Sequence, residues 1–258
     1  MKLAVLVKEV PDTYGDRKLN LETGLADRGA SDAVLDEVTE RAMEVALTYA
    51  DAHDGTEVVA VVLAPEGSVT TVRKALAMGA ARAIHIADEA LLGADILLTA
   101  EALAAAIKRE SFDLVIAGNS STDGSGGMVS AAIAESLGIA HVSGLATVEI
   151  TDTEVTGARP VDGGVQHVQA ALPAVISITE ALPDPRFPNF KGIMAAKKKP
   201  LDALTLADLG VDADDLEAAR SIMLTVSVKP PRAAGIKIVD EGDAGDLLAK
   251  FLIENRLV

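Results

Sequence analysis

The sequence has no cysteine, no tryptophan, and only two tyrosines and four phenylalanines among its 258 residues. Without cysteine, disulfides and thiolate metal sites are excluded, which fits the cytoplasmic location that we expect. The formal net charge of −16 argues against nucleic-acid binding, which depends on neutralising phosphates. No apolar run approaches the roughly 18 residues that a membrane-spanning helix needs. The first apolar stretch is soon interrupted by Lys8 and Glu9, so it predicts a buried strand rather than a signal peptide.

Apolar residues make up 49% of the chain, and their pattern in the first half predicts alternating strands and helices. The predicted strands are residues 3–8, 57–63, 83–87 and 113–118, and the predicted helices are residues 31–51, 69–78, 96–108 and 127–137. Near-continuous apolar strands separated by helices indicate a parallel sheet that is covered on both faces. We therefore expect an α/β fold with a doubly wound, mostly parallel sheet.

The second half of the chain has a different pattern. Residues 146–150 and 154–158 predict a β-hairpin around a polar turn, and two short strands follow at residues 165–171 and 174–178. Pro230 and Pro231 interrupt regular structure before a last predicted helix at about residues 242–252. We expect a nucleotide-binding α/β domain over residues 1–228 and a C-terminal arm over residues 229–258 that lies on a partner.

Residues 183–199, the docking segment below, concentrate proline and aromatic residues. Three prolines fall within six residues, and Phe187 and Phe190 are half of the phenylalanine in the chain. Proline lowers the entropy lost on docking, and aromatic anchors contribute strongly to interfaces. These features favour a surface that meets a partner, and Ile193 and Met194 extend it. The alternative is a structured connection whose rings pack on the protein's own core. Lys197–Lys199 fit either a solvated helix end or a docking role.

A glycine- and hydroxyl-rich turn follows the predicted strand at residues 113–118. It reads GNSSTDGSGG and leads into a predicted helix. Ligands of open α/β sheets bind at the carboxyl ends of strands, and free N–H groups at a helix N-terminus favour a phosphate. No P-loop or dinucleotide fingerprint is present. The turn therefore predicts a cradle for a nucleotide phosphate, and a plain flexible loop is the alternative.

The sequence shows no catalytic constellation. None of the four histidines, His53, His85, His141 and His167, has a companion at metal-ligand spacing, and no nucleophile elbow accompanies them. His85 lies within a predicted strand and is interpreted as a core or edge residue. These features indicate a protein that binds ligands and partners without catalysing a reaction of its own.

Several ordered motifs resemble one known family over nearly the whole chain. They are residues 5–12 (VLVKEVPD), 40–47 (ERAMEVAL), 73–80 (RKALAMGA), 113–118 (DLVIAG), 122–124 (TDG), 172–175 (LPAV), 185–187 (PRF) and 193–199 (IMAAKKK). The chain resembles the β subunit of electron transfer flavoprotein. The resemblance implies an adenine-nucleotide α-hydrolase-like fold and a heterodimer with an α subunit that holds most of an FAD. It also implies a structural AMP in the β subunit.

The resemblance also implies which residues face the cofactors. They are Leu6, Asp36, Glu37, Val38, Thr39, Leu63, Gly118, Asn119, Ser120, Ser121, Thr122, Asp123, Gly124, Ser125, Gly126, Gly127, Met128 and Val129 for AMP, and Gln166 for the flavin region. The family often has Asn-Pro-aromatic where this chain has Asp36-Glu37-Val38. Many members have a carboxylate at the position of Gln166, so we expect altered flavin potentials here.

The resemblance further implies partners. Acyl-CoA dehydrogenases would supply the electrons, as in fatty acid oxidation, and a quinone oxidoreductase would receive them. The docking segment would contact dehydrogenases through Phe187, Phe190, Ile193 and Met194, with Phe190 at the position of the family's apolar anchor.

Three alternatives remain. One is an ATP-dependent hydrolase or adenylyl-transfer protein, and another is a stand-alone nucleotide sensor that resembles universal stress proteins. The third is a flavin-bifurcating member of the same family, with a second FAD in the AMP site.

Overall fold

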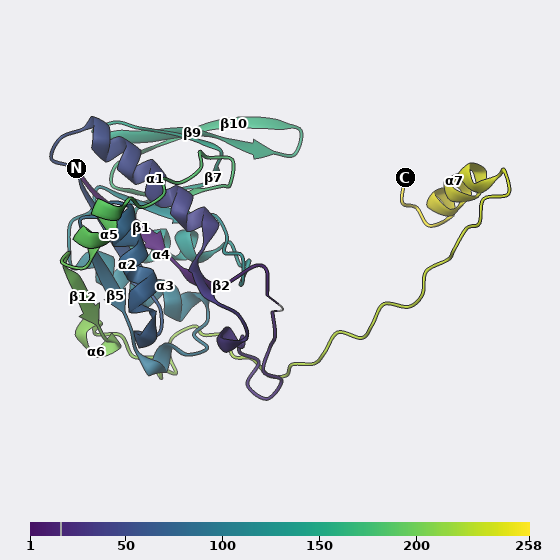
Figure 1. Ribbon diagram of the computed structural model, residues 1–258, viewed down its shortest axis with the longest axis horizontal. Coiled ribbons are helices and arrows are strands. Elements are labelled where there is room, and N and C mark those ends of the chain that lie inside the picture. Colours follow the sequence, from purple (N-terminus) through teal and green to yellow (C-terminus); the bar gives the residue numbers. More distant parts are fainter. Residues whose placement is uncertain (16) are drawn as a thin grey trace. The chain divides into compact units, whose positions relative to one another are not determined.

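A computed structural model describes residues 1–15 and 17–258, which form two compact units, Met1–Leu224 and Thr225–Val258 (Figure 1). The first unit is an α/β domain. The expected boundary after residue 228 falls just inside the second unit. None of the helices in the described ranges is both long enough and apolar enough to span a bilayer.

Seven strands form the central sheet of the first unit, in the order β12-β5-β4-β1-β6-β11-β7. In chain order they are β1 (Lys2–Val7), β4 (Glu57–Leu63), β5 (Arg82–Ile86), β6 (Leu114–Gly118), β7 (Ala140–Leu145), β11 (Ala174–Ile178) and β12 (Leu201–Leu204). Every neighbouring pair is parallel. The predicted doubly wound α/β fold is confirmed. The pattern did not reveal β7 and β12, because these edge strands are half exposed and lack a continuous apolar run.

Helices cover both faces of this sheet. One face packs against α1 (Glu37–Ala52), α2 (Val69–Met78) and α5 (Phe190–Ala196), and the other against α3 (Ile96–Lys108), α4 (Val129–Leu137) and α6 (Leu206–Leu209). Each face of the sheet has its own hydrophobic core, and strand β1 contributes to both. Leu3, Val5 and Val7 lie in the core under α1, α2 and α5, and Ala4 and Leu6 lie in the core under α3, α4 and α6. This alternation explains the unbroken apolar run, since both faces of the strand are buried.

A second sheet is antiparallel, with the order β10-β9-β8. It contains β8 (Thr147–Ile150), β9 (Glu154–Val161) and β10 (Gly164–Ala171), which confirms the predicted hairpin and the predicted strand over residues 165–171. Figure 1 shows β9 and β10 at one end of the α/β unit. The sheet is joined to the first core through Val155, which is buried there.

The predicted helix over residues 31–51 begins too early. Residues Ala33–Leu35 form β3, which pairs antiparallel with β2 (Glu9–Pro11), and α1 begins only at Glu37. The carboxylate of Asp36 accepts a hydrogen bond from the backbone N–H of Val38 and so caps α1. The helix predicted from residue 127 likewise begins at Val129, because Gly127 has a φ of 65°.

Three short 3₁₀ helices complete the first unit: η1 (Arg28–Ala30), η2 (Glu66–Ser68) and η3 (Glu89–Leu91). The second unit contains α7 (Ala244–Glu254), close to the predicted last helix. None of the residues of α7 is buried, although its sequence is amphipathic and includes Leu247, Leu248 and Ile253.

Candidate functional site

The glycine-rich turn lies where the chain reverses its direction of winding through the parallel sheet. Strand β1 has β4 on one side and β6 on the other, so crossovers leave in opposite directions from this point. The turn follows the carboxyl end of β6, and Lys8 follows the carboxyl end of β1. Open α/β sheets bind ligands at such a switch point. The topology therefore places the turn where the sequence predicted a ligand site.

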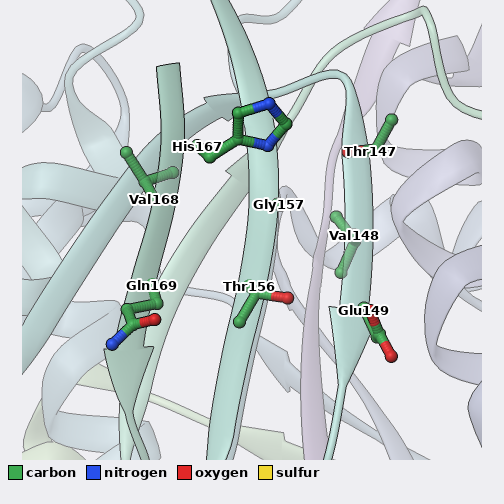
Figure 2. A pocket seen from close by; sticks show the side chains of 8 residues that line it. All are labelled: Thr147, Val148, Glu149, Thr156, Gly157, His167, Val168 and Gln169. Atoms are coloured by element: carbon green, nitrogen blue, oxygen red, sulfur yellow. The ribbon is translucent and has the colours of Figure 1, made fainter.

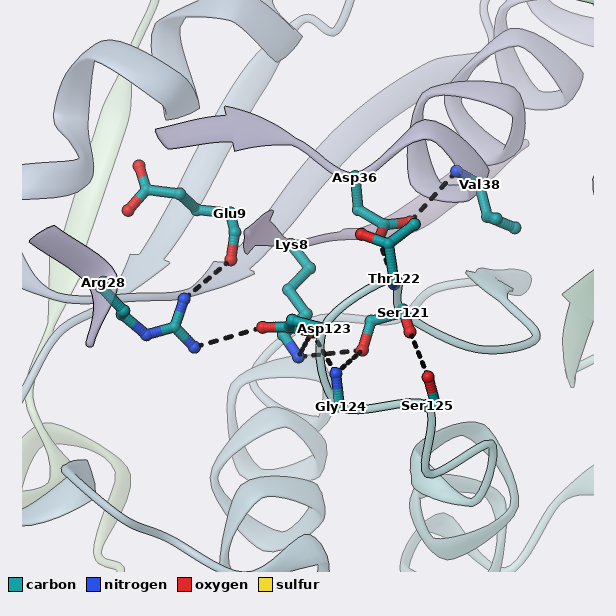
Figure 3. Close-up of polar contacts among 10 residues, drawn as sticks. All are labelled: Lys8, Glu9, Arg28, Asp36, Val38, Ser121, Thr122, Asp123, Gly124 and Ser125. Atoms are coloured by element: carbon teal, nitrogen blue, oxygen red, sulfur yellow. Dashed lines mark hydrogen bonds and ion pairs between the residues drawn. The ribbon is translucent and has the colours of Figure 1, made fainter. Parts of the chain in front are cut away.

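A buried carboxylate ties the turn to the start of α1. The side chain of Asp36 is fully buried, and its Oδ2 accepts a hydrogen bond from the N–H of Thr122 at 2.7 Å (Figure 3). Its Oδ1 accepts from the N–H of Val38 at 3.1 Å. The hydroxyl of Thr39 donates to the Asp36 carbonyl oxygen at 2.8 Å. Asp36, the residue before α1, thus holds the turn in place.

A second carboxylate in the turn is held by two cations. Lys8 Nζ lies 2.7 Å from Asp123 Oδ1, and Arg28 Nη2 lies 3.4 Å from Asp123 Oδ2. Burial opposes ionisation, yet the hydrogen bonds from Lys8 and Ser121 lower the pKa of the Asp123 carboxyl to about 2. Lys8 and Arg28 thus place two cations at the turn, opposite the carboxylates of Asp123 and Asp36. Arg28 was not among the predicted site residues, because it reaches the turn from a distant loop.

The turn's backbone is organised by its own polar atoms. The N–H of Gly124 donates to Ser121 Oγ at 3.2 Å, and the N–H of Ser125 donates to the Ser121 carbonyl at 3.0 Å. Ser125 and Gly127 adopt positive φ values of 50° and 65°. Among the described residues, no side chain caps the N-terminus of α4 at Met128. The first N–H groups of α4 are therefore left for a ligand or solvent.

Two further features fit a nucleotide at this turn. Within the described part of the chain, the buried Oγ1 of Thr122 has no hydrogen-bond partner, and a buried hydroxyl normally has one. A nucleotide hydroxyl or phosphate oxygen would satisfy it. At the end of β6, a Cβ added to Gly118 would lie 3.1 Å from Val38 Cγ1, so glycine allows α1 to start close to the strand. The residues present therefore fit a bound AMP.

The other predicted cofactor residues are spread around this point. Leu6 is buried in β1, Leu63 is half buried at the end of β4, and Glu37 is exposed. The N–H of Asn119 donates to the carbonyl of Ile178 at 2.8 Å, which fixes the first residue of the turn. The remaining members of the turn are partly or fully exposed: Ser120, Gly126 and Val129.

Gln166 does not join this group, because it lies on β10 of the antiparallel sheet. Its Oε1 accepts a hydrogen bond from Arg159 Nε at 2.9 Å, and Arg159 also donates to Ser143 Oγ at 3.2 Å. Nearby on β7, burial and then the charge of Arg159 lower the pKa of His141, whose Nε2 lies 3.1 Å from Ser130 Oγ. No motif along the chain predicts this polar group, because its members come from two sheets and from α4.

The antiparallel sheet also has a shallow hollow of about 390 Å³ (Figure 2). Its lining residues come from all three strands and are Thr147, Val148, Glu149, Thr156, Gly157, His167, Val168 and Gln169. None of the predicted cofactor residues lines it. His167, which has no metal-ligand companion in the sequence, is one of these lining residues and is labelled in Figure 2.

The docking segment presents its rings to solvent. Phe187 is 95% exposed and Phe190 is 80% exposed, while Ile193 and Met194 are about half exposed. The interpretation that these rings pack on the protein's own core is therefore wrong. Contact with a partner stays a prediction.

The three lysines that follow are not equivalent. Lys199 Nζ donates to the carbonyls of Leu76 and Ala80 at 2.9 and 2.6 Å, and burial lowers its pKa. It thus binds the carbonyl end of α2. Lys197 is exposed and Lys198 is also exposed, so only these two lysines are free to meet solvent or another molecule.

Comparisons with known proteins show the family of the chain. A family model described as the electron transfer flavoprotein domain matches residues 23–209. The chain is 46% identical to the "Electron transfer flavoprotein subunit beta" of Mycobacterium leprae strain TN, over 99% of both chains. It is 36% identical to the protein of the same name from Syntrophomonas wolfei, over 93% of this chain and 91% of that one. It is 31% identical to the "Caffeyl-CoA reductase-Etf complex subunit CarD" of Acetobacterium woodii, over 97% of this chain and 98% of that one. The chain belongs to the electron transfer flavoprotein family, as a β subunit that carries electrons and is not itself an enzyme.

Proposed function

We propose that this β subunit forms a heterodimer with an α subunit that holds most of an FAD. The heterodimer accepts electrons from acyl-CoA and related dehydrogenases and passes them to a quinone oxidoreductase, in cytoplasmic fatty acid oxidation. FAD supplies the redox chemistry when it is bound. The β subunit contributes the docking segment and a wall of the complex, and the C-terminal arm wraps the α subunit.

The second part of the proposal is that the glycine-rich turn holds AMP. This proposal rests mainly on the turn at the switch point of the sheet, which Asp36 and Lys8 hold in place. The turn leads to the uncapped N–H groups of α4, and among the described residues the buried hydroxyl of Thr122 has no hydrogen-bond partner. The phosphate would meet these N–H groups and the cationic side chains of Lys8 and Arg28. A nucleotide bound only by the folded state stabilises the subunit by mass action.

The direct test is to co-express the chain with its α-type subunit, denature the purified complex and identify the released nucleotides. One FAD and one AMP per heterodimer are expected. A stable lone chain that carries no nucleotide would overturn both parts of the proposal.

A flavin-bifurcating complex is the second candidate. It is supported by the 31% identity to the CarD subunit of the caffeyl-CoA reductase-Etf complex. AMP and the adenylate half of FAD require the same cradle, so the residues of the turn suit both ligands. Two FADs and no AMP in the denatured complex would select this candidate.

Gln166 adds a proposal about the flavin. A neutral side chain in place of a carboxylate removes a negative charge, and negative charge disfavours an anionic reduced flavin. Gln166→Glu in the assembled complex is therefore expected to lower the flavin reduction potentials. Unchanged potentials, measured by redox titration with FAD content unaltered, would contradict the role of Gln166.

The arm proposal has its own test. Truncation after residue 228 is expected to leave the α/β domain folded, because α7 contributes no buried residue to it. The truncated chain should lose its α subunit during gel filtration. Retention of a full complement of α subunit would refute the wrapping role.

A further inference from the structure

We propose that Glu44 and Arg186 are positioning residues for electron transfer, because together they fix the docking segment in the conformation that presents Phe187 and Phe190. The inference rests on the proposed function, since it concerns how a dehydrogenase is met. It adds a role for two charged residues, one of them on a helix outside the docking segment.

The contact between Glu44 and Arg186 has three hydrogen bonds. Arg186 donates from Nε to Glu44 Oε2 at 2.8 Å and from Nη2 to Oε1 at 2.9 Å, and its backbone N–H also donates to Oε2 at 2.9 Å. Arg186 Nη1 further pairs with Asp51 Oδ2 at 2.9 Å. A bidentate pair with a backbone bond fixes the direction of the chain as well as the side chain.

The electrostatics agree with this geometry. The side chain of Glu44 is only 15% exposed. Burial alone would raise the pKa of Glu44, but the hydrogen bonds and charge of Arg186 bring that pKa below its ordinary value. Hydrogen bonding to Glu44 raises the pKa of Arg186. Both groups therefore stay charged at neutral pH, and the contact persists.

A second contact from α1 holds the chain just before Arg186. Arg41 donates to the carbonyl oxygen of Leu182 and pairs with Asp184 Oδ1 at 2.6 Å. Arg41 and Glu44 lie three residues apart on α1, so they occupy one face of the helix. The same face of α1 thus binds the docking segment at Asp184 and at Arg186.

The other end of the docking segment is held by α2. A Cβ on Gly192 would lie 2.6 Å from the carbonyl oxygen of Ala77, so the first turn of α5 sits directly on α2. Arg73 of α2 donates to the carbonyls of Ala196 and Lys199 at 2.6 and 2.8 Å. Both ends of the segment are therefore fixed to neighbouring helices.

The exposed rings lie between these two anchors. Phe187 follows Arg186 directly, and Phe190 is the first residue of α5, with Pro188 between them. Proline limits the freedom of the short connection. A segment that is ordered before binding loses less entropy on docking, so its aromatic anchors bind more tightly. Neither Glu44 nor Arg186 needs to touch the dehydrogenase for this effect.

The test compares two glutamates of α1 in the assembled, FAD-loaded heterodimer. Glu44→Gln removes the charge that holds Arg186. Glu40→Gln is the matched control, because Glu40 is 17% exposed, lies one turn earlier and pairs with Lys74 of α2 at 2.8 Å instead. Steady-state reduction by an acyl-CoA dehydrogenase gives KM for the dehydrogenase and kcat. Amide exchange at Phe187, Asn189 and Phe190 reports the order of the segment, since Pro188 has no amide N–H.

Glu44→Gln is expected to raise KM about tenfold, the size of a change when one charge-assisted contact is lost. The kcat, FAD content and thermal midpoint should match those of Glu40→Gln. Amide exchange at Phe187, Asn189 and Phe190 should be faster in Glu44→Gln alone. In a double-mutant cycle with Phe187→Ala, the KM effects should be less than additive, because a displaced ring has less binding to lose.

Several outcomes overturn the inference. Equal KM values and equal exchange rates for Glu44→Gln and Glu40→Gln would refute it, as would strictly additive effects with Phe187→Ala. If Glu44→Gln lost FAD content or thermal stability in proportion to its rise in KM, Glu44 would have a merely structural role. A wild-type complex that accepts no electrons from the dehydrogenase would overturn the proposed function, and the docking role with it.

Discussion

The glycine-rich turn and the docking segment use charged residues in opposite ways. Beside the turn, Asp36 is fully buried and accepts the backbone N–H groups of Val38 and Thr122, so its charge holds the turn against the start of α1. At the docking segment, Arg186 pairs with Glu44 of α1 and directly precedes the exposed Phe187. The first arrangement buries a charge that orders backbone N–H groups, while the second places an ion pair next to apolar side chains that the fold leaves exposed.

The two regions differ in how much their side chains contribute to the stability of the fold. Helix α1 serves both, since its capping residue Asp36 holds the turn, and Arg41 and Glu44 hold the docking segment. A buried, fully bonded carboxylate is part of the structure that it supports. An exposed ring adds little to folding. Substitutions should therefore affect stability strongly in the turn and weakly at the rings.

The largest effect is expected for Asp36→Ala. This change removes the cap of α1 and leaves the N–H of Thr122 without its acceptor, so the free energy of unfolding should fall by about 3 kcal/mol. AMP should be lost from the purified complex. Urea unfolding and nucleotide analysis measure the two consequences.

Asp95→Ala is the matched control for this change. Asp95 caps α3 through the N–H of Leu98 at 2.8 Å and accepts a distant N–H, from Ser221, at 2.6 Å. Asp95→Ala should lower the free energy of unfolding by a similar amount to Asp36→Ala and leave the AMP content unchanged. Loss of AMP in both variants would mean that the nucleotide responds to general stability and not to the turn.

The next effect is expected for Gly192→Ala, at the end of the docking segment. The new Cβ would lie 2.6 Å from a backbone oxygen of α2, so α5 must move. Overpacking of this kind should lower the free energy of unfolding by about 2 kcal/mol. The variant should also weaken electron acceptance. Gly67→Ala, where an added Cβ meets nothing within 4 Å, is the control. Equal stability of the two variants would show that α5 is loosely attached.

A smaller, pH-dependent effect is expected for Asp123→Asn. The folded pKa of about 2 lies below the ordinary value of 3.8, so ionised Asp123 stabilises the fold above the ordinary pKa. That stabilisation should be lost as pH falls from about 4 towards 2. Because Lys8 and Arg28 are partly exposed, we expect about 1 kcal/mol at neutral pH.

Unfolding curves of the wild type and Asp123→Asn should therefore converge as the pH falls through this window. Asp202→Asn is the control, since its carboxylate is mostly exposed and lies 3.4 Å from Arg82. A constant difference between wild type and Asp123→Asn down to pH 2 would be inconsistent with a depressed pKa.

The smallest effect on stability is expected at the rings. Phe187→Ala and Phe190→Ala should change the free energy of unfolding by no more than about 0.5 kcal/mol, since both rings are exposed. Both should slow electron acceptance from dehydrogenases while FAD content stays normal. Leu92→Ala, at another exposed apolar residue, should leave the rate unchanged. Unaltered rates in Phe187→Ala and Phe190→Ala would remove the docking role.

Much of the parallel sheet was predictable from sequence. The bounds of β4, α2, α3 and β11 match the predicted ranges, because each is a continuous apolar run or a clear helical repeat between turn residues. The errors fall where local pattern is weak. β3 was read as the start of a helix, since its three residues form a strand only by pairing with β2. The edge strands β7 and β12 are defined by a neighbour on one side only.

The candidate site also has a part that local sequence predicts and a part that depends on long-range contacts. Glycines, serines and the following helix identified the turn without tertiary information, because backbone freedom and free N–H groups are local properties. The buried Asp36 bond to Thr122 joins residues 86 positions apart. Arg28 reaches Asp123 across 95 positions, and Arg186 reaches Glu44 across 142. Such pairs have no signature along the chain.

The α/β class and the position of the glycine-rich turn follow from the sequence alone, because they depend on periodicity and residue type. The tertiary structure was needed to show that the rings of the docking segment are exposed, and that one helix, α1, contacts both the turn and the docking segment. The reason is physical. An ion pair or a shared backbone donor needs its atoms within about 3 Å, and packing of the sheet and helices alone brings such distant residues together.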